Sequence, residues 1–170
     1  MPTIRSPRQQ GPKTRGEVFD VGEAVTFQVA VLSNLISRPF YAQMGRYTGM
    51  TINDWRLILV IACRPGLSQT EIIHATGFNK TTVSRSLRHL KKYVRIEPHP
   101  GDNRKQAVYL TQDGWDKYHE SLPALAWRQN LLTDALQPDE LRQFRQTLAK
   151  LIANARQWAD TLDDSNGLSR

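Results

Sequence analysis

The chain has 170 residues, 39% of them hydrophobic, which is enough to bury one substantial core but seldom two independent ones. No apolar run approaches the ~18 residues that span a bilayer, and we expect neither a membrane anchor nor a signal peptide. The formal net charge of +7 is concentrated, because residues 78–105 contribute +6 and residues 1–16 contribute +4. Such concentration is typical of surfaces that bind phosphates and favours nucleic acid as the partner.

The first fifty residues divide into a basic arm and a helix. Residues 1–16 contain three prolines and no apolar periodicity, which predicts a disordered arm. The arm is as consistent with a tail without function as with a supplementary DNA contact. Within residues 17–50 we expect a helix from about Phe19 to Ser37 that ends before Pro39. An apolar stripe that begins with Val21 and Val25 marks this helix as one half of a candidate dimer interface.

The lone cysteine and the histidines argue against several other kinds of site. Cys63 has no partner for a disulfide within the chain, which favours the cytoplasm, and its place at the end of an apolar helix favours a structural thiol. The four histidines lack metal-like spacing, and there is neither a catalytic triad nor a glycine-rich phosphate loop. We therefore expect no metal, no cofactor and no enzymatic activity.

Residues 68–90 predict a helix-turn-helix. Ser68 and Glu71 have the spacing of a capping box, Gly77 allows the positive φ of a turn, and Asn79 is a good N-cap for the next helix. That helix buries one face, whereas its other face carries short polar and cationic side chains that suit the major groove, although an ordinary solvated face is the alternative. The candidate DNA contacts are Ser68, Gln69 and Thr70 in the first helix and Asn79, Lys80, Thr81, Thr82, Ser84, Arg85 and Arg88 in the second.

A hairpin should follow. Val94–Glu97 and Gln106–Leu110 alternate apolar and polar residues, as strands with one buried face do. Pro98, Pro100 and Gly101 lie between them and should form a tip that cannot extend the ladder. Cations at such a tip suit the narrow, electronegative minor groove, although a solubilising charged turn is the alternative. The candidate wing contacts are Asp102, Asn103, Arg104 and Lys105.

Residues 68–114 resemble the reading head of the MarR (multiple antibiotic resistance) family of bacterial transcriptional regulators. The similarity includes Thr82–Arg85 in the second helix, Asp102–Arg104 in the wing and Leu110–Gly114 at the start of the next helix. One departure is the turn Lys91–Val94, which is shorter than usual in the family and has no glycine. The resemblance implies a mainly α fold with a small β-hairpin wing, in which N- and C-terminal dimerisation helices flank a winged helix-turn-helix.

Residues 111–165 should form the C-terminal dimerisation helices, after a winged helix-turn-helix at 51–110 and before a tail at 166–170. The first helix should begin near Thr111 and kink at Pro123, and the second should begin at Pro138. Apolar residues then recur every three or four positions, the period of a coiled-coil seam, which favours a homodimer over an intramolecular bundle. With Val21 and Val25, the candidate interface residues are Leu141, Phe144, Leu148, Leu151, Trp158 and Leu162.

The resemblance implies a transcriptional regulator, most often a repressor, that binds palindromic double-stranded operator DNA as a homodimer. It also implies that a small effector releases the protein from the DNA, and aromatic carboxylates are the favoured class of effector. Trp55 offers an apolar plate for such an effector, and Arg38 or Arg56 could bind its carboxylate. The alternatives are that Trp55 belongs to the core and that both arginines are solvated. The alternative function is a winged-helix module that binds a protein without specific DNA binding.

Overall fold

The structure, a computed structural model, describes residues 20–43 and 49–167, without the side chains of 40–43, 103 and 162–167. The predicted basic arm, the side chains of Asn103 and Leu162, and residues 168–170 lie outside this description. The chain divides into two compact units between Gly49 and Met50, which are described separately below.

The N-terminal unit contains helix α1, Val25–Gln43, which is displaced from the predicted Phe19–Ser37. A turn precedes it, because the Asp20 carboxylate accepts a hydrogen bond from the Gly22 amide at 2.8 Å, so Val21 lies before the helix. Pro39 lies inside α1, and the prediction that the helix would end before it is wrong. A proline removes one hydrogen-bond donor and opposes only the turn before it, so a helix with enough other bonds can continue.

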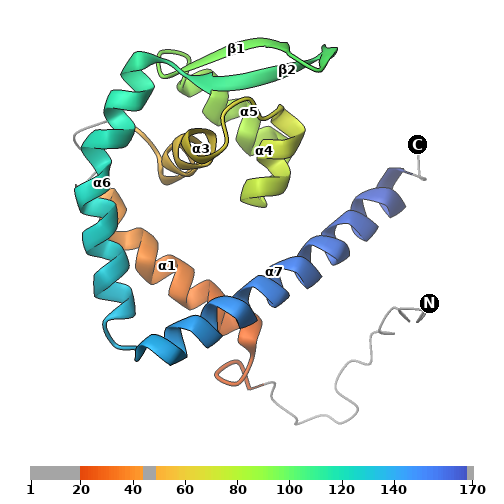
Figure 1. The fold of residues 1–170 in the computed structure, drawn as a ribbon. Helices are drawn as coiled ribbons and strands as arrows, with labels where there is room; N and C mark the ends of the chain where they lie inside the picture. Colours follow the sequence, from red (N-terminus) through yellow and green to blue (C-terminus); the bar gives the residue numbers. More distant parts are fainter. Residues whose placement is uncertain (1–19, 44–48, 168–170) are drawn as a thin grey trace. The chain divides into compact units, whose positions relative to one another are not determined.

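The second unit begins with a winged helix-turn-helix. Its elements are α3 (Ile52–Cys63), α4 (Gln69–Thr76), α5 (Lys80–His89), β1 (Val94–His99) and β2 (Asp102–Leu110). In Figure 1 the hairpin lies over the three helices, and α3 contacts α4, α5 and β2, which places it at the centre of the core. The predicted fold class is confirmed. Fully buried side chains come from each of these layers: Leu57, Ile58, Ile61, Ile72, Val83, Leu90 and Val108.

The capping residues and the glycine turn of the helix-turn-helix adopt the predicted conformations. The Ser68 hydroxyl accepts from the Glu71 amide at 3.3 Å, and the Glu71 carboxylate accepts from the Ser68 amide at 2.8 Å. Gly77 ends α4 with a φ of 69°, and the Asn79 side chain caps α5 by accepting from the Thr82 amide at 2.8 Å. These caps fix where α4 and α5 begin and how tightly the chain turns between them.

The hairpin is longer than predicted. β1 continues to His99 and β2 begins at Asp102, so the prediction that Pro98 lies in a tip that cannot extend the ladder is wrong. Pro98 pairs with Gln106, and the register shifts between Pro98 and His99. In a two-stranded hairpin each strand has an open edge, where a residue without an N–H costs no ladder bond. Arg104 and Lys105 therefore lie on β2 rather than in the turn, which is Pro100–Gly101.

The turn between α5 and β1 forms without the glycine common in the family. The amides of Tyr93 and Val94 both donate to the Leu90 carbonyl, at 2.7 and 3.0 Å. Helix α6 (Gln112–Thr133) begins against this turn, because the Thr111 hydroxyl donates to the Lys92 carbonyl at 2.9 Å. The wing is thus held at its base by hydrogen bonds to the start of α6.

The C-terminal helices follow the predicted starts. Pro123 lies inside α6, which runs on to Thr133, and α7 extends over Pro138–Gly167.

Cys63 is exposed at the end of α3, so the expectation of a structural thiol is wrong, because the last residue of that helix lies beyond its buried face. Among the described helices, none combines the length and the apolar character needed to cross a bilayer.

Candidate nucleic-acid interface

Helix α5 has one buried face and one open face. Val83, Ser86 and Leu87 are buried, which anchors the helix in the core. The sequence-predicted contacts lie on the opposite side: Lys80, Thr81, Arg85 and Arg88 are exposed, and Thr82 and Ser84 are half-buried. The N-cap Asn79 is exposed as well, with its carbonyl oxygen engaged by the Thr82 amide.

The cations on the open face of α5 are not paired with acids in the part of the chain that the structure describes. Within the described residues, no acidic side chain forms an ion pair with Lys80, Arg85 or Arg88. A helix whose open face presents three cations that no described acidic side chain pairs with has a positive potential over that face, which attracts a polyanion. Neutral hydroxyl groups between the cations leave room for hydrogen bonds to base edges.

The three predicted contacts at the start of α4 differ in their surroundings. Ser68 is buried, and its hydroxyl both donates to the Glu71 carboxylate at 2.6 Å and accepts from the Glu71 amide, so it is committed to the cap. Gln69 is half-buried and Thr70 is exposed. An open groove of about 480 Å³ separates this end of α4 from β2; it is lined by Ser68, Gln69, Thr70, Glu71, Arg104, Lys105 and Gln106.

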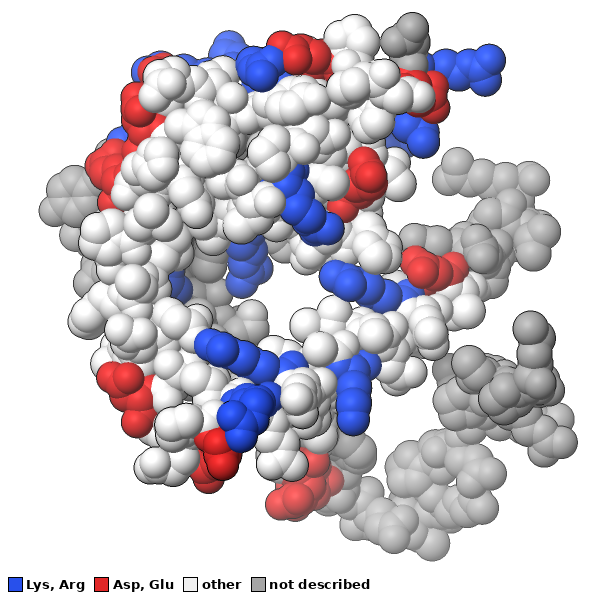
Figure 2. All heavy atoms as spheres, in the orientation of Figure 1, with Lys and Arg blue, Asp and Glu red and all other residues white. Residues whose placement is uncertain are grey.

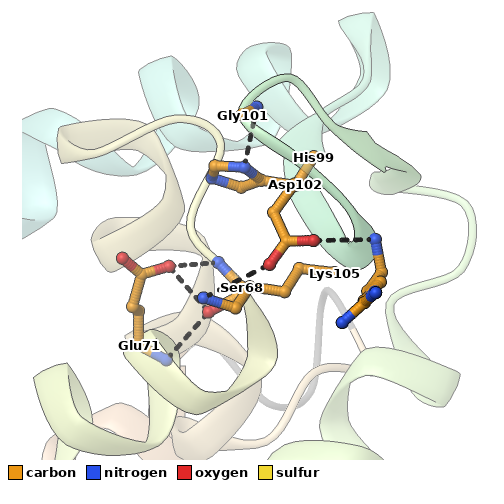
Figure 3. A network of polar contacts seen from close by, with 7 residues as sticks. Ser68, Glu71, His99, Gly101, Asp102 and Lys105 are labelled. Carbon is orange, nitrogen blue, oxygen red and sulfur yellow. Dashed lines mark hydrogen bonds and ion pairs between the residues drawn. The ribbon is translucent and has the colours of Figure 1, made fainter.

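On the β2 side of this groove, Asp102 interacts with the two residues that carry positive charge. Its carboxylate accepts a hydrogen bond from the Arg104 amide at 3.0 Å. It also lies 3.8 Å from the Lys105 ammonium, and Figure 3 shows these two side chains next to each other. Across the groove, hydrogen bonds from the Ser68 side chain and amide keep the pKa of Glu71 below its usual 4.5, and the positive charge of Lys105 acts in the same direction. The groove is therefore lined by ionised groups of both signs.

The charge of the wing is largely compensated, unlike that of α5. Lys92 pairs with Asp113 at 3.3 Å, and Arg95 pairs with Glu97 on the same strand. Figure 2 shows the same mixture, with Lys and Arg interspersed with Asp and Glu along the upper edge, over the hairpin. Arg104 is exposed and forms no ion pair with any described acidic residue. It is thus the wing cation most available to a ligand.

Sequence reasoning missed a polar contact beneath the recognition face. Asp54, on α3, is buried, and its carboxylate lies 2.7 Å from Nδ1 of His89 at the end of α5. Thr51 and Asp54 form a capping box that their spacing could have revealed. No spacing rule could have revealed His89 as the partner, because it lies 35 positions further along the chain.

The predicted effector residues have different environments. Trp55 is 3% exposed and belongs to the core, whereas the Arg56 guanidinium lies 5.9 Å from the centre of the Phe78 ring. Arg128 on α6 was not predicted; burial lowers its pKa, and the nearby charge of Arg56 lowers it further. Arg56 and Arg128 are thus two like charges within electrostatic range of each other. Arg38 is exposed on α1, in the other unit.

The predicted dimer residues form an apolar stripe that the described chain leaves largely open. Phe144, Leu151 and Trp158 are exposed, the last to 68%, and Leu141 and Leu148 are half-buried. Val21 and Val25 are exposed near the first described residues of the N-terminal unit. Apolar surface of this extent on helices is typical of an interface with another protein chain.

The described geometry defines the class of protein: a winged helix-turn-helix of the kind found in transcription regulators. More particularly, the sequence model of the MarR family matches residues 48–105, which span most of the winged helix-turn-helix, and the resemblance inferred above is confirmed. No curated protein matches the chain.

Solved structures of regulators have the same fold. A MarR/EmrR family regulator from Acinetobacter sp. ADP1 is 26% identical, with a TM-score of 0.75 over 82% of this chain and 99% of its own. Bordetella bronchiseptica BpsR, described for regulation of its DNA binding by 6-hydroxynicotinic acid, is 20% identical, with a TM-score of 0.69 over 79% and 97%. Streptomyces coelicolor PcaV, solved with its natural ligand, is 17% identical, with a TM-score of 0.68 over 82% and 99%.

Proposed function

We propose that the chain is a transcriptional regulator that binds palindromic double-stranded DNA as a homodimer. The observation that carries this proposal is the exposed face of α5, on which Lys80, Arg85 and Arg88 lack acidic partners among the described residues. A helix of this kind fits the major groove, where arginine binds the O6 and N7 of guanine through two hydrogen bonds. In this proposal Arg85 reads a base, with Thr81 and Ser84 beside it.

The remaining contacts position the helix on the duplex. Gln69 and Thr70 at the start of α4 bind phosphates, where the helix dipole favours an anion. Arg104 reaches from β2 into the minor groove, whose negative potential is strongest over A·T-rich sequence. Ser68 and Asp102 support these contacts through the cap of α4 and the shape of the wing.

The homodimer is supported by the exposed stripe on α7. A side chain such as Trp158, 68% exposed, gains about 25 cal/mol for each Å² of apolar surface that a second copy covers. Two reading heads joined in this way would bind half-sites about one helical turn apart. The protein would act in the cytoplasm, where the DNA of a bacterium lies.

We further propose that the regulator is a repressor released by a small aromatic carboxylate. The pair Arg56 and Arg128 supports an anionic ligand, because a carboxylate between two guanidinium groups relieves their repulsion. Control by an aromatic acid is described for the Bordetella relative, whose DNA binding is regulated by 6-hydroxynicotinic acid. Phe78, beside Arg56, adds an aromatic surface.

Fluorescence anisotropy with fragments of the host genome tests the DNA proposal. We expect preferential binding to a fragment that contains an inverted repeat and an affinity that falls steeply with salt, as counterions are released. Arg85→Ala should reduce the preference for the repeat at a cost of about 1–3 kcal/mol. Arg142→Ala is the control, because it removes one arginine of α7 that pairs with Asp139 at 2.6 Å. Absence of binding to every fragment would favour a protein-binding winged-helix module.

A further inference from the structure

The Asp54 carboxylate joins the recognition helix to the centre of the core. One of its oxygens, Oδ2, accepts from the Thr51 amide at 2.8 Å and lies 2.7 Å from Nδ1 of His89. The Ser86 side chain, on the buried face of α5, donates a further hydrogen bond to the same carboxylate. A single acidic side chain of α3 therefore binds both the start of its own helix and two positions of α5.

This arrangement keeps a buried group charged. Burial opposes the ionisation of Asp54, but hydrogen bonds from Thr51, Ser86 and His89 outweigh it, so the pKa of Asp54 lies below its usual 3.8. A buried carboxylate is tolerated only where donors surround it, and loss of one donor is costly. The His89 side chain is about half exposed, at 53%, so its contribution is directional rather than a matter of packing.

Directional bonds matter here because the other buried side chains on this face of α5, Val83 and Leu87, are apolar. Hydrophobic burial is not directional, so the hydrogen bonds of Asp54 add an orientational restraint on α5 that burial alone does not provide. His89 lies one turn beyond Arg85, about 6 Å along a rigid helix. A shift at His89 is therefore passed directly to Arg85, and a hydrogen bond to a base edge weakens steeply when its geometry is lost.

We infer that Asp54 is a positioning residue for base recognition: through His89 and Ser86 it fixes the orientation of α5 on α3, so that Arg85 meets the base edge in the major groove. This inference rests on the proposed DNA-binding function. It predicts that Asp54 and His89 affect the choice between DNA sequences far more than the strength of binding to any duplex. Phosphate contacts survive a small rotation of α5, whereas base contacts do not.

The test compares the affinity for the best inverted repeat with that for a scrambled duplex at one salt concentration. Asp54→Asn and His89→Ala should each reduce this ratio about tenfold, and the double variant should lose less than the sum of the two single losses, because both substitutions perturb the contact between Asp54 and His89. His74→Ala is the matched control, since His74 is an exposed histidine in the last turn of the neighbouring helix α4. His89→Gln, whose side-chain amide can still donate to Asp54, should keep more of the ratio than His89→Ala.

If Asp54 and His89 only stabilised the fold, their substitution would leave the ratio of the two affinities unchanged. A fraction of unfolded protein lowers the apparent affinity for the inverted repeat and for the scrambled duplex by the same factor. An unchanged ratio in His89→Ala, or additive losses in the double variant, would overturn the inference. If Asp54→Asn fails to fold, His89→Ala still decides, because its side chain is half exposed. If the parent protein does not distinguish the two duplexes, the proposed function is overturned instead. Amide hydrogen exchange in α5 would then still test whether Asp54 restrains this helix. We expect exchange in α5 to be faster in His89→Ala than in the parent, and unchanged in His74→Ala.

Discussion

Gly114 joins the base of the wing to α6 at a point where no side chain fits. A Cβ at this position would lie 2.1 Å from the Tyr93 carbonyl oxygen and 3.2 Å from the Cβ of Leu110. Because a backbone oxygen cannot move aside alone, Gly114→Ala should destabilise the protein by about 1–3 kcal/mol in spite of the higher helix propensity of alanine. Urea unfolding measures the loss. Gly101→Ala is the control, since a Cβ there meets nothing nearer than 3.6 Å, and equal stability of the two variants would refute the argument.

Asp54 should make the stability of the winged domain sensitive to acid. Its pKa is lowered in the folded protein, so the stabilisation that it provides is complete above the unfolded value of about 3.8 and is lost as the pH falls through the folded value. Asp54→Asn should therefore cost about 1–3 kcal/mol near pH 6 and progressively less below pH 4, as the parent carboxyl takes up a proton first in the unfolded and then in the folded protein. Urea unfolding of both proteins at a series of pH values gives the difference. A difference that stays constant down to pH 3 would contradict this role of the carboxylate.

At the scale of elements, the wing provides a comparison between two arginines. Arg95 pairs with Glu97 and lies 4.6 Å over the Tyr109 ring, whereas Arg104 is exposed and lacks an acidic partner in the described chain. Arg104→Ala should weaken binding to a repeat with A·T-rich flanks by about tenfold, and Arg95→Ala should change it much less. Both variants lose one positive charge, so anisotropy titrations of the two isolate the local contact from the general electrostatic effect. Equal losses would show that net charge alone accounts for the wing's contribution.

The elements that could be predicted from sequence are those with local causes. The capping box of Ser68 and Glu71, the positive φ of Gly77 and the start of α7 at Pro138 each depend on residues within one turn. The continuation of β1 through Pro98 could not be predicted, because the cost of a missing N–H depends on which edge of the strand is paired. Similarly, the start of α1 at Val25 depends on a turn that apolar periodicity does not report.

The candidate site shows the same division. The exposed face of α5 follows from the spacing of Val83 and Leu87, so its cations could be identified in advance. The burial of Ser68 and of Trp55, in contrast, depends on the packing of several elements. The contact of Asp54 with His89 joins two helices far apart in sequence, and it needs the fold itself to be seen.

At the scale of the whole molecule, the proposed function depends on the distance between two reading heads. Each head presents the +6 of residues 78–105, and such a charge attracts any duplex irrespective of its sequence. Selectivity for a palindrome arises only when both α5 helices enter successive major grooves on one side of the DNA. The dimer therefore offers a means of control that no single head has, because a change in spacing disrupts the pair while each head stays intact.

A ligand that prefers a dimer with a different spacing must weaken DNA binding, and DNA must weaken ligand binding by the same factor, about 5- to 150-fold. We expect this reciprocity when 6-hydroxynicotinic acid and related aromatic carboxylates are titrated into the protein–DNA complex and, separately, into the free protein. Arg128→Gln should lower ligand affinity because it removes one of the two guanidinium groups, and it should leave DNA affinity unchanged without ligand. Arg142→Gln on α7 is the control for charge. Carboxylates that bind the free protein yet leave its affinity for the repeat unaltered would exclude ligand control of this kind, even where DNA binding itself is intact.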